Sequence, residues 1–238
     1  MLQTRILAIQ SKIARATLDA GRPVGSVRLL AVSKKHSAES VAEAHRAGLR
    51  EFAENYADEL CEKAAELKAL KNIRWVFVGQ LQSNKIGKIV RCADEVQSVA
   101  TEKHARLIDR SAKDLGRSRY PVWIVVNAAA EDSKQGVSLE ELPKLVLFIV
   151  EKCEFLALRG IMAIPPASYS DDAWAGELNH VVPSLYQDLR KAADGAGEGL
   201  LSLGMTGDLA LSVAAGSDCV RIGTAIFGER DVTRHQKA

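Results

Sequence analysis

Apolar residues recur along this chain in two alternating patterns. Short apolar runs, such as Val27–Val32 and Pro121–Val126, are typical of parallel strands that are buried on both faces. Between these runs lie longer segments whose apolar residues are spaced three or four apart, as on one face of a helix. The first segment of this kind is marked by four residues, Leu2, Ile6, Ile9 and Ile13. We therefore expect an N-terminal helix over about residues 1–20, followed by alternating strands and helices.

Eight strands are predicted from this pattern. They cover Val27–Val32, Glu51–Ala53, Ile73–Val78, Glu95–Val99, Pro121–Val126, Leu156–Ile164, Leu200–Leu203 and Cys219–Ile222. Helices are expected between them, including one continuous helix from Asp171 to about Ala193. Eight strand–helix units in a chain of 238 residues fit a (β/α)8 barrel. A doubly wound open sheet shows the same alternation, and the barrel is favoured because eight strands can close.

No linker rich in Pro, Gly or Ser divides the chain, so we expect a single domain over residues 1–238 with its barrel core at about 27–230. Apolar residues make up 47% of the chain, which is enough for a sizeable core. Aromatic residues make up only 5%, and the net charge is +2 with both signs interspersed. This composition offers neither a stacking platform nor a basic stripe, so no nucleic-acid partner is expected.

Targeting and redox signals point to the cytoplasm. The N-terminus has no unbroken apolar stretch of the secretory type, and no segment approaches the ~18 apolar residues of a membrane span. Four cysteines lie far apart without CxxC spacing, and we expect them to be reduced thiols: Cys61, Cys92, Cys153 and Cys219.

A candidate reactive group follows the first predicted strand. Lys34 comes two residues after Val32, at the carboxyl end of the strand, where α/β proteins usually have their catalytic and binding residues. Desolvation at that place lowers the pKa of an amine and makes it a nucleophile towards a carbonyl. The alternative is a lysine that merely extends from the strand end into solvent.

A candidate phosphate site follows the last two predicted strands. The stretch L-S-L-G-M-T-G-D contains Thr206, and the stretch V-R-I-G-T-A-I-F-G contains Gly223 and Thr224. Loops after strands 7 and 8 of a barrel often bind phosphate through backbone amides and hydroxyls. Each loop alone is explained equally well as turn chemistry. Together they predict a phosphate site, which barrel closure brings next to Lys34.

Arg221 lies two residues before Gly223 on the last predicted strand and is expected to point inward at the same place. A lysine beside a phosphate site is consistent with a Schiff-base aldolase or with a protein of pyridoxal 5'-phosphate (PLP). In the second case Arg221 could contact the pyridine nitrogen without protonating it, because its pKa is high. The alternative for Arg221 is a buried salt bridge with Asp218 or Glu54.

Seven ordered motifs resemble the pyridoxal phosphate homeostasis family over about residues 27–230. They are A-V-S-K at Ala31–Lys34, E-N-Y at Glu54–Tyr56, G-Q-L-Q-S-N-K at Gly79–Lys85, S-K-Q-G at Ser133–Gly136, R-G-I-M-A-I-P at Arg159–Pro165, L-S-L-G-M-T-G-D at Leu201–Asp208 and G-S-D-C-V-R-I-G-T-A-I-F-G-E-R at Gly216–Arg230.

The resemblance implies a barrel similar to the N-terminal domain of alanine racemase, of fold type III, with PLP as cofactor. It implies Lys34 as the Schiff-base lysine and Arg221 facing the pyridine nitrogen. The phosphate would be held by Thr206, Gly223 and Thr224, and the cofactor would also be lined by Asn55 and Met162. No catalytic residue and no metal ligand is expected.

The chain departs from the family pattern beside these positions. The family generally has S-K-T-K-P where this chain has S-K-K-H-S at Ser33–Ser37, and G-E-N-Y where this chain has Ala53. It generally has G-M-S where this chain has Thr206, which keeps the hydroxyl. Lys35 and His36 change the charge next to Lys34, and His36 is expected to be a solvated loop residue.

The expected function is that of a PLP carrier. Racemisation on this scaffold needs a second base, which a C-terminal domain supplies in alanine racemase, and only about eight residues follow Arg230 here. We therefore expect a monomer that holds PLP and delivers it to apo-enzymes, without efficient catalysis. A PLP-dependent amino-acid racemase and a Schiff-base aldolase are the alternatives from the class of enzymes.

Overall fold

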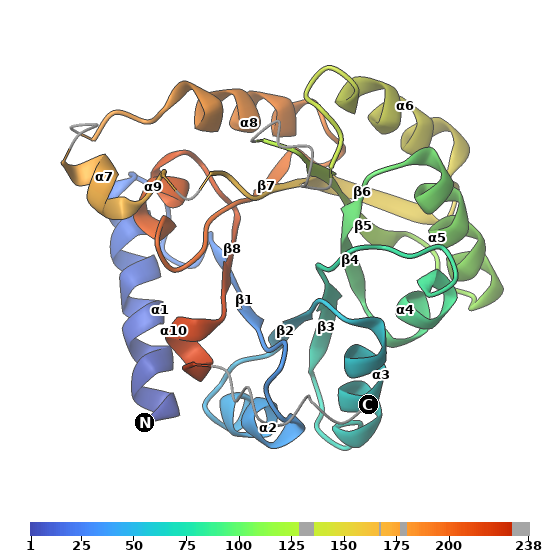
Figure 1. The fold of residues 1–238 in the computed structure, drawn as a ribbon, viewed down its shortest axis with the longest axis horizontal. Coiled ribbons are helices and arrows are strands. Elements are labelled where there is room, and N and C mark those ends of the chain that lie inside the picture. The colour runs from blue at the N-terminus through green and yellow to red at the C-terminus, as the bar shows by residue number, and fades with distance from the viewer. Residues whose placement is uncertain (129–135, 167, 177–179, 230–238) are drawn as a thin grey trace.

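The computed structural model describes residues 1–128, 136–166, 168–176 and 180–229. Eight parallel strands form a closed barrel in chain order, and the last strand pairs with the first (Figure 1). The strands are β1 (Arg28–Val32), β2 (Glu51–Glu54), β3 (Arg74–Phe77), β4 (Glu95–Val99), β5 (Tyr120–Val126), β6 (Leu156–Ala163), β7 (Leu200–Ser202) and β8 (Cys219–Ile222). The prediction of a (β/α)8 barrel is confirmed, and the open sheet is excluded.

Helices surround the barrel on its outer side (Figure 1). They are α1 (Leu2–Asp19), α2 (Ala38–Arg46), α3 (Ala57–Glu66), α4 (Ile86–Cys92), α5 (Glu102–Asp114), α6 (Leu142–Lys152), α7 (Asp171–Ala175), α8 (Ser184–Asp194), α9 (Leu209–Ala214) and α10 (Thr224–Phe227). The expected N-terminal helix is α1, which packs against α9 and α10 through a face that includes the buried Ile6 and Ile13.

The prediction of one helix from Asp171 to about Ala193 is wrong. The segment contains two helices, since α7 ends at Ala175 and α8 begins at Ser184. Pro183 precedes α8 with φ −58° and ψ 148°, an extended conformation that does not continue a helix. The apolar residues keep a helical spacing on both sides of this break, but Pro183 prevents one helix from continuing through it. Residues 177–179 lie outside the described part of the chain.

The barrel interior is mixed in character. A small apolar cluster of Leu30, Ala53, Val76 and Cys219 is separate from the large core between the strands and the helices. Because successive strand side chains point to opposite faces, Arg28 shares the inward side of β1 with Leu30. Arg221 shares the inward side of β8 with Cys219 for the same reason. The interior therefore contains charged side chains above and below a thin apolar layer.

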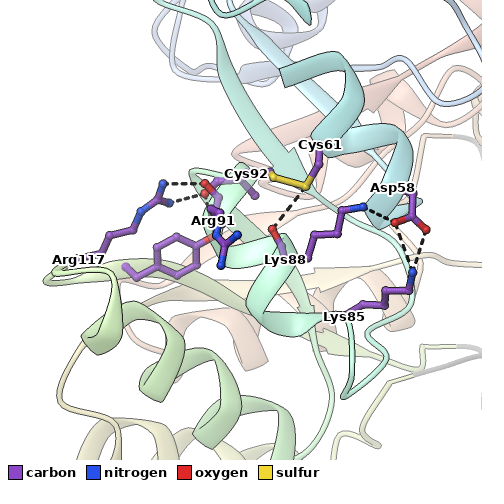
Figure 2. Close-up of a disulfide and its surroundings, with 9 residues drawn as sticks. Asp58, Cys61, Lys85, Lys88, Arg91, Cys92 and Arg117 are labelled. Atoms are coloured by element: carbon purple, nitrogen blue, oxygen red, sulfur yellow. Dashed lines mark hydrogen bonds and ion pairs between the residues drawn. A yellow bond between two sulfur atoms is a disulfide. The ribbon is translucent and has the colours of Figure 1, made fainter. Parts of the chain in front are cut away.

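The prediction that the four cysteines are reduced is wrong for two of them. Cys61 on α3 and Cys92 on α4 form a disulfide, with their Cα atoms 5.3 Å apart (Figure 2). The two are separated by 31 positions, and only the packing of α3 against α4 brings them together. Figure 2 also shows Asp58 of α3 paired with Lys85 and Lys88. Cys153 and Cys219 are buried free thiols, as expected.

Among the residues described, no helix combines the length and the apolar character needed to cross a bilayer.

Candidate functional site

The carboxyl ends of β1, β2, β6, β7 and β8 surround a cavity of about 310 Å³. All seven residues predicted from the sequence line it. These are Lys34, Asn55, Met162, Thr206, Arg221, Gly223 and Thr224. Barrel closure brings them together, because the pairing of β8 with β1 places the carboxyl end of β8 beside that of β1, which Lys34 follows.

A buried cluster of charges holds the backbone on both sides of Lys34. The Lys63 amine donates to the carbonyl oxygen of Ser33, at 2.8 Å, which belongs to the peptide group before Lys34. The Glu59 carboxylate accepts from the amide of Lys35, at 2.6 Å, which belongs to the peptide group after it. Lys63 also pairs with Glu59 at 2.8 Å, so one cluster fixes both peptide groups. Lys35 itself has a φ of 62°, a left-handed conformation that such contacts hold in place.

Glu54 completes this cluster beneath the strand ends. Its carboxylate accepts from Lys63 at 2.6 Å and from the hydroxyl of Ser33 at 2.7 Å. Burial raises the pKa of Glu54 from its ordinary 4.5 to about 7, against the opposing effect of the Lys63 amine. Because Glu54 directly precedes Asn55, the cluster connects the two strand ends that supply Lys34 and Asn55.

Arg221 is a buried cation with 6% of its surface exposed. Its guanidinium donates to the Ser202 hydroxyl at 2.8 Å and to the Ala163 carbonyl oxygen at 2.7 Å. Among the described residues no carboxylate lies within ion-pair distance of it, because Asp218 pairs with two other arginines and Glu54 pairs with Lys63. The alternative of a structural salt bridge with Asp218 or Glu54 is therefore not realised. Desolvation lowers the pKa of Arg221.

The loop after β7 is held rigidly from below by Asp208. This carboxylate accepts from the amide of Met205 at 2.7 Å, from the hydroxyl of Tyr186 at 3.1 Å and from the hydroxyl of Ser212 at 3.0 Å. Gly204 has a φ of 104°, and a Cβ there would lie 2.7 Å from that of Ser212. The loop therefore requires glycine at that position, and it leaves Thr206 exposed at the cavity.

The loop after β8 lines the same cavity, next to the loop after β7. Gly223 and Thr224 form the start of α10, whose first amides have no partner inside the helix. A Cβ on Gly223 would lie 3.1 Å from the carbonyl oxygen of Val32, so the glycine permits close packing against β1. The two loops follow neighbouring strands and present hydroxyl and amide groups to one cavity, as groups at anion-binding sites do.

Asn55 and Met162 line the inner wall of the cavity. Gly79 allows the next strand end to approach Asn55, since a Cβ on Gly79 would lie 1.9 Å from the carbonyl oxygen of Asn55. The Asn55 Oδ1 atom is buried and has no hydrogen-bond partner among the residues that the structure describes. Met162 is 2% exposed and supplies an apolar surface. A ligand in this cavity can therefore gain a hydrogen bond by donating to Asn55.

Sequence analysis missed part of the lining and the support behind it. The additional lining residues are Val32, His36, Val78, Ile164, Met205 and Gly207. His36 is a half-buried loop residue that stacks on Phe227, with ring centroids 5.1 Å apart, and lines the cavity. Met205 and Gly207 belong to a motif already quoted and could have been found from it. Ser133–Gln135 and Arg230, which belong to two other motifs, lie outside the described residues.

The geometry defines a class of protein, a (β/α)8 barrel whose mouth brings a lysine, a buried arginine and two hydroxyl-bearing loops to one cavity. The family model described as alanine racemase, N-terminal domain, matches residues 8–231. The pyridoxal phosphate homeostasis protein of Pasteurella multocida is 38% identical over 98% of this chain and 99% of its own length. The protein of that name from Caenorhabditis elegans is 36% identical over 97% of both.

Solved structures agree with these comparisons. PipY of Synechococcus elongatus is 32% identical over 96% of this chain and 100% of its own. The TM-score is 0.78 for its structure without PLP and 0.73 for its structure with PLP bound. This chain belongs to the family of pyridoxal phosphate homeostasis proteins.

Proposed function

We propose that this protein binds PLP at the barrel mouth through Lys34, keeps it in a protected form and delivers it to apo-enzymes, without efficient catalysis of its own. The single observation that best supports the proposal is the convergence of Lys34, Arg221 and both hydroxyl-bearing loops on one cavity of about 310 Å³.

The residues present fit the chemical groups of PLP. Thr206, Gly223 and Thr224 offer hydroxyl and amide donors to the phosphate. Asn55 Oδ1 is a buried acceptor without a partner, as expected of a residue completed by a ligand. When bound, PLP supplies an electrophilic aldehyde, and the amine of Lys34 is the nucleophile that holds it. The cluster of Glu54, Glu59 and Lys63 orients Lys34 by fixing its two peptide groups.

Arg221 favours a carrier over an enzyme. A guanidinium donates hydrogen bonds and accepts none, so it can bind the pyridine nitrogen only when that nitrogen is unprotonated. An unprotonated ring withdraws electrons weakly from a bound amino acid. The same contact anchors the ring, which suits a protein that stores the cofactor.

A racemase is the second candidate, and one observation favours it. His36 lines the same cavity as Lys34 and could serve as a second acid or base. The carrier is preferred because Arg221 disfavours the carbanion that racemisation needs.

Recipients, assembly and location complete the proposal. Apo forms of PLP-dependent enzymes are the recipients, the protein acts as a monomer, and it works in the cytoplasm. The cytoplasmic location belongs to the proposal only, and the disulfide removes the support that the cysteine pattern offered it.

Borohydride labelling tests the proposal. The protein is loaded with PLP, reduced with borohydride, digested and mapped by mass spectrometry. The expected result is one pyridoxyl group, on the peptide that contains Lys34. Free pyridoxal without phosphate, applied at the same concentration, is the control and should label poorly. Labelling spread over surface lysines, with no preference for Lys34, would overturn the proposal.

A further inference from the structure

The buried charge of Arg221 needs an explanation that its direct contacts do not give. Its two described partners, Ser202 and Ala163, are neutral. A buried cation is costly unless another group compensates its charge. Asp208 acts on Arg221 at a distance, but its oxygens already accept from Met205, Tyr186 and Ser212.

A chain of hydrogen bonds leads from Arg221 through the barrel interior to a carboxylate. Arg221 donates to the Ser202 hydroxyl at 2.8 Å, and this hydroxyl donates to Gln97 Oε1 at 2.8 Å. Gln97 Nε2 then donates to Glu95 Oε1 at 2.7 Å. Ser202, Gln97 and Glu95 are all 0% exposed. The chain crosses from β8 through β7 to β4 without reaching water.

The direction of this chain is fixed at its far end. An ionised carboxylate only accepts hydrogen bonds, so Glu95 requires the amide nitrogen of Gln97 to point towards it. The amide oxygen of Gln97 must then point towards Ser202 and accept its proton. The lone pairs of the Ser202 hydroxyl are left for Arg221. Hydrogen bonds aligned in this way polarise one another in a low-dielectric interior.

The hydrogen-bonded system that ends at Arg221 contains more cations than carboxylates. Glu95 also pairs with Arg28 at 3.3 Å and with Arg74 at 2.6 Å, and Arg28 pairs with Glu51. Three arginines are thus connected to two carboxylates in one hydrogen-bonded system. The uncompensated positive charge lies at Arg221, where the cavity opens.

We propose that Glu95 is a positioning residue for PLP binding, and that it acts on Arg221 through Gln97 and Ser202. We call the hydrogen-bonded series Arg221, Ser202, Gln97 and Glu95 the relay. Glu95 fixes the direction of the hydrogen bonds in the relay, and so keeps the guanidinium charged and pointing towards the pyridine nitrogen. This inference rests on the proposed function for its consequence in PLP binding. The relay itself is a property of the chain without cofactor.

Three variants test the relay. Glu95→Gln keeps the size of the side chain but can donate as well as accept, so it no longer fixes the direction. Ser202→Ala breaks the relay in its middle and leaves the pairs of Glu95 with Arg28 and Arg74 intact. Glu51→Gln is the matched control, because Glu51 pairs with Arg28 in the same interior but lies outside the relay.

The first measurement uses the cofactor-free protein. The nitrogen-15 and proton signals of the Arg221 guanidinium, assigned with Arg221→Lys, should shift in Glu95→Gln and in Ser202→Ala but not in Glu51→Gln. The second measurement uses PLP-loaded protein. Both relay variants should bind PLP roughly tenfold more weakly, the loss expected for one weakened charge-assisted hydrogen bond, and should change its absorption band alike.

The double variant separates a relay from two independent structural effects. Once Ser202→Ala has broken the chain, adding Glu95→Gln should change neither the Arg221 signal nor the absorption band further. Additive effects, or an unchanged Arg221 signal in Ser202→Ala, would overturn the inference. If the unmodified protein does not bind PLP at Lys34, the proposed function fails, and the cofactor-free measurement still decides the relay. A Glu95→Gln protein that does not fold leaves the decision to Ser202→Ala.

Discussion

At the scale of single residues, Thr206 offers the most direct test of the proposed phosphate site. Thr206→Val keeps the side-chain volume but removes the hydroxyl that we propose donates to a phosphate oxygen, a loss of about 1.5–3 kcal/mol. Binding of PLP should therefore weaken roughly 10- to 100-fold. Binding of pyridoxal, which lacks the phosphate, should hardly change. Titration of both ligands by fluorescence measures the difference, and equal losses would mean that Thr206 only supports its loop.

Glu54 gives the protein a distinctive dependence on pH. The folded protein holds the Glu54 proton more tightly than the unfolded chain, because burial raises the pKa from 4.5 to about 7. The contribution of this group to the free energy of unfolding is therefore complete below pH 4.5 and falls as the pH rises to about 7. Glu54→Gln, which resembles the neutral acid, should lose this decline in urea titrations across that window. The distant surface variant Glu198→Gln should keep it, and identical pH profiles for Glu54→Gln and the unmodified protein would contradict the assignment.

At this scale the sequence predicted the lining of the cavity but not what supports it. Lys34, Thr206, Gly223 and Thr224 were found because they follow apolar strands, and barrel geometry makes strand ends meet. Lys63 gave no such signal, since a lysine in a charged helix is normally a solvated side chain. Its burial becomes visible only when α3 is packed against the strand ends. The same holds for Gln97, whose partner Ser202 lies 105 positions further along the chain.

At the scale of elements, the disulfide between α3 and α4 should stabilise the fold measurably. It closes a loop between positions 31 apart, for which chain-entropy estimates give about 3–4 kcal/mol. Reductant should lower the free energy of unfolding in urea by about this amount. The double variant Cys61→Ser, Cys92→Ser is the control and should not respond to reductant. Equal unfolding midpoints with and without reductant in the unmodified protein would show that the bond does not form in solution.

The elements themselves were largely predictable, and the errors have identifiable causes. All eight strands were placed close to their observed positions, and the clearest were those with continuous apolar runs, such as β5. The helix predicted from Asp171 failed because apolar spacing was weighed above Pro183. The four-residue α10 was missed because so short a helix has no periodic pattern. The disulfide was missed because pairing depends on which helices become neighbours.

At the scale of the whole molecule, we predict that the PLP-loaded protein is nearly silent as a catalyst. Stereoinversion needs an acid and a base on opposite sides of the cofactor ring. Arg221 would leave the pyridine nitrogen unprotonated, so a carbanion at the α-carbon of a bound amino acid would gain little stabilisation from the ring. L-alanine in heavy water should therefore gain deuterium at its α-carbon only very slowly, without inversion, as measured by mass spectrometry and chiral chromatography.

One outcome of that assay would reverse the interpretation. Turnover approaching the ~10 s⁻¹ of an ordinary enzyme, with inversion, would make the protein a racemase. His36 would then be the first residue to replace, because it lines the cavity. His36→Ala should abolish such turnover and leave the binding of PLP intact.

The pairing of β8 with β1 has a consequence for how the protein folds while the ribosome synthesises it. Lys34 is made early, whereas Arg221 and Thr224 are made near the end, and the cavity needs all three. Translation at about 5–20 residues per second separates these events by on the order of ten seconds or more. During that interval Lys34 is present without the residues of β8 that line the cavity beside it. The proposed site therefore forms only when β8 pairs with β1, so binding of the cofactor would report that the barrel has closed.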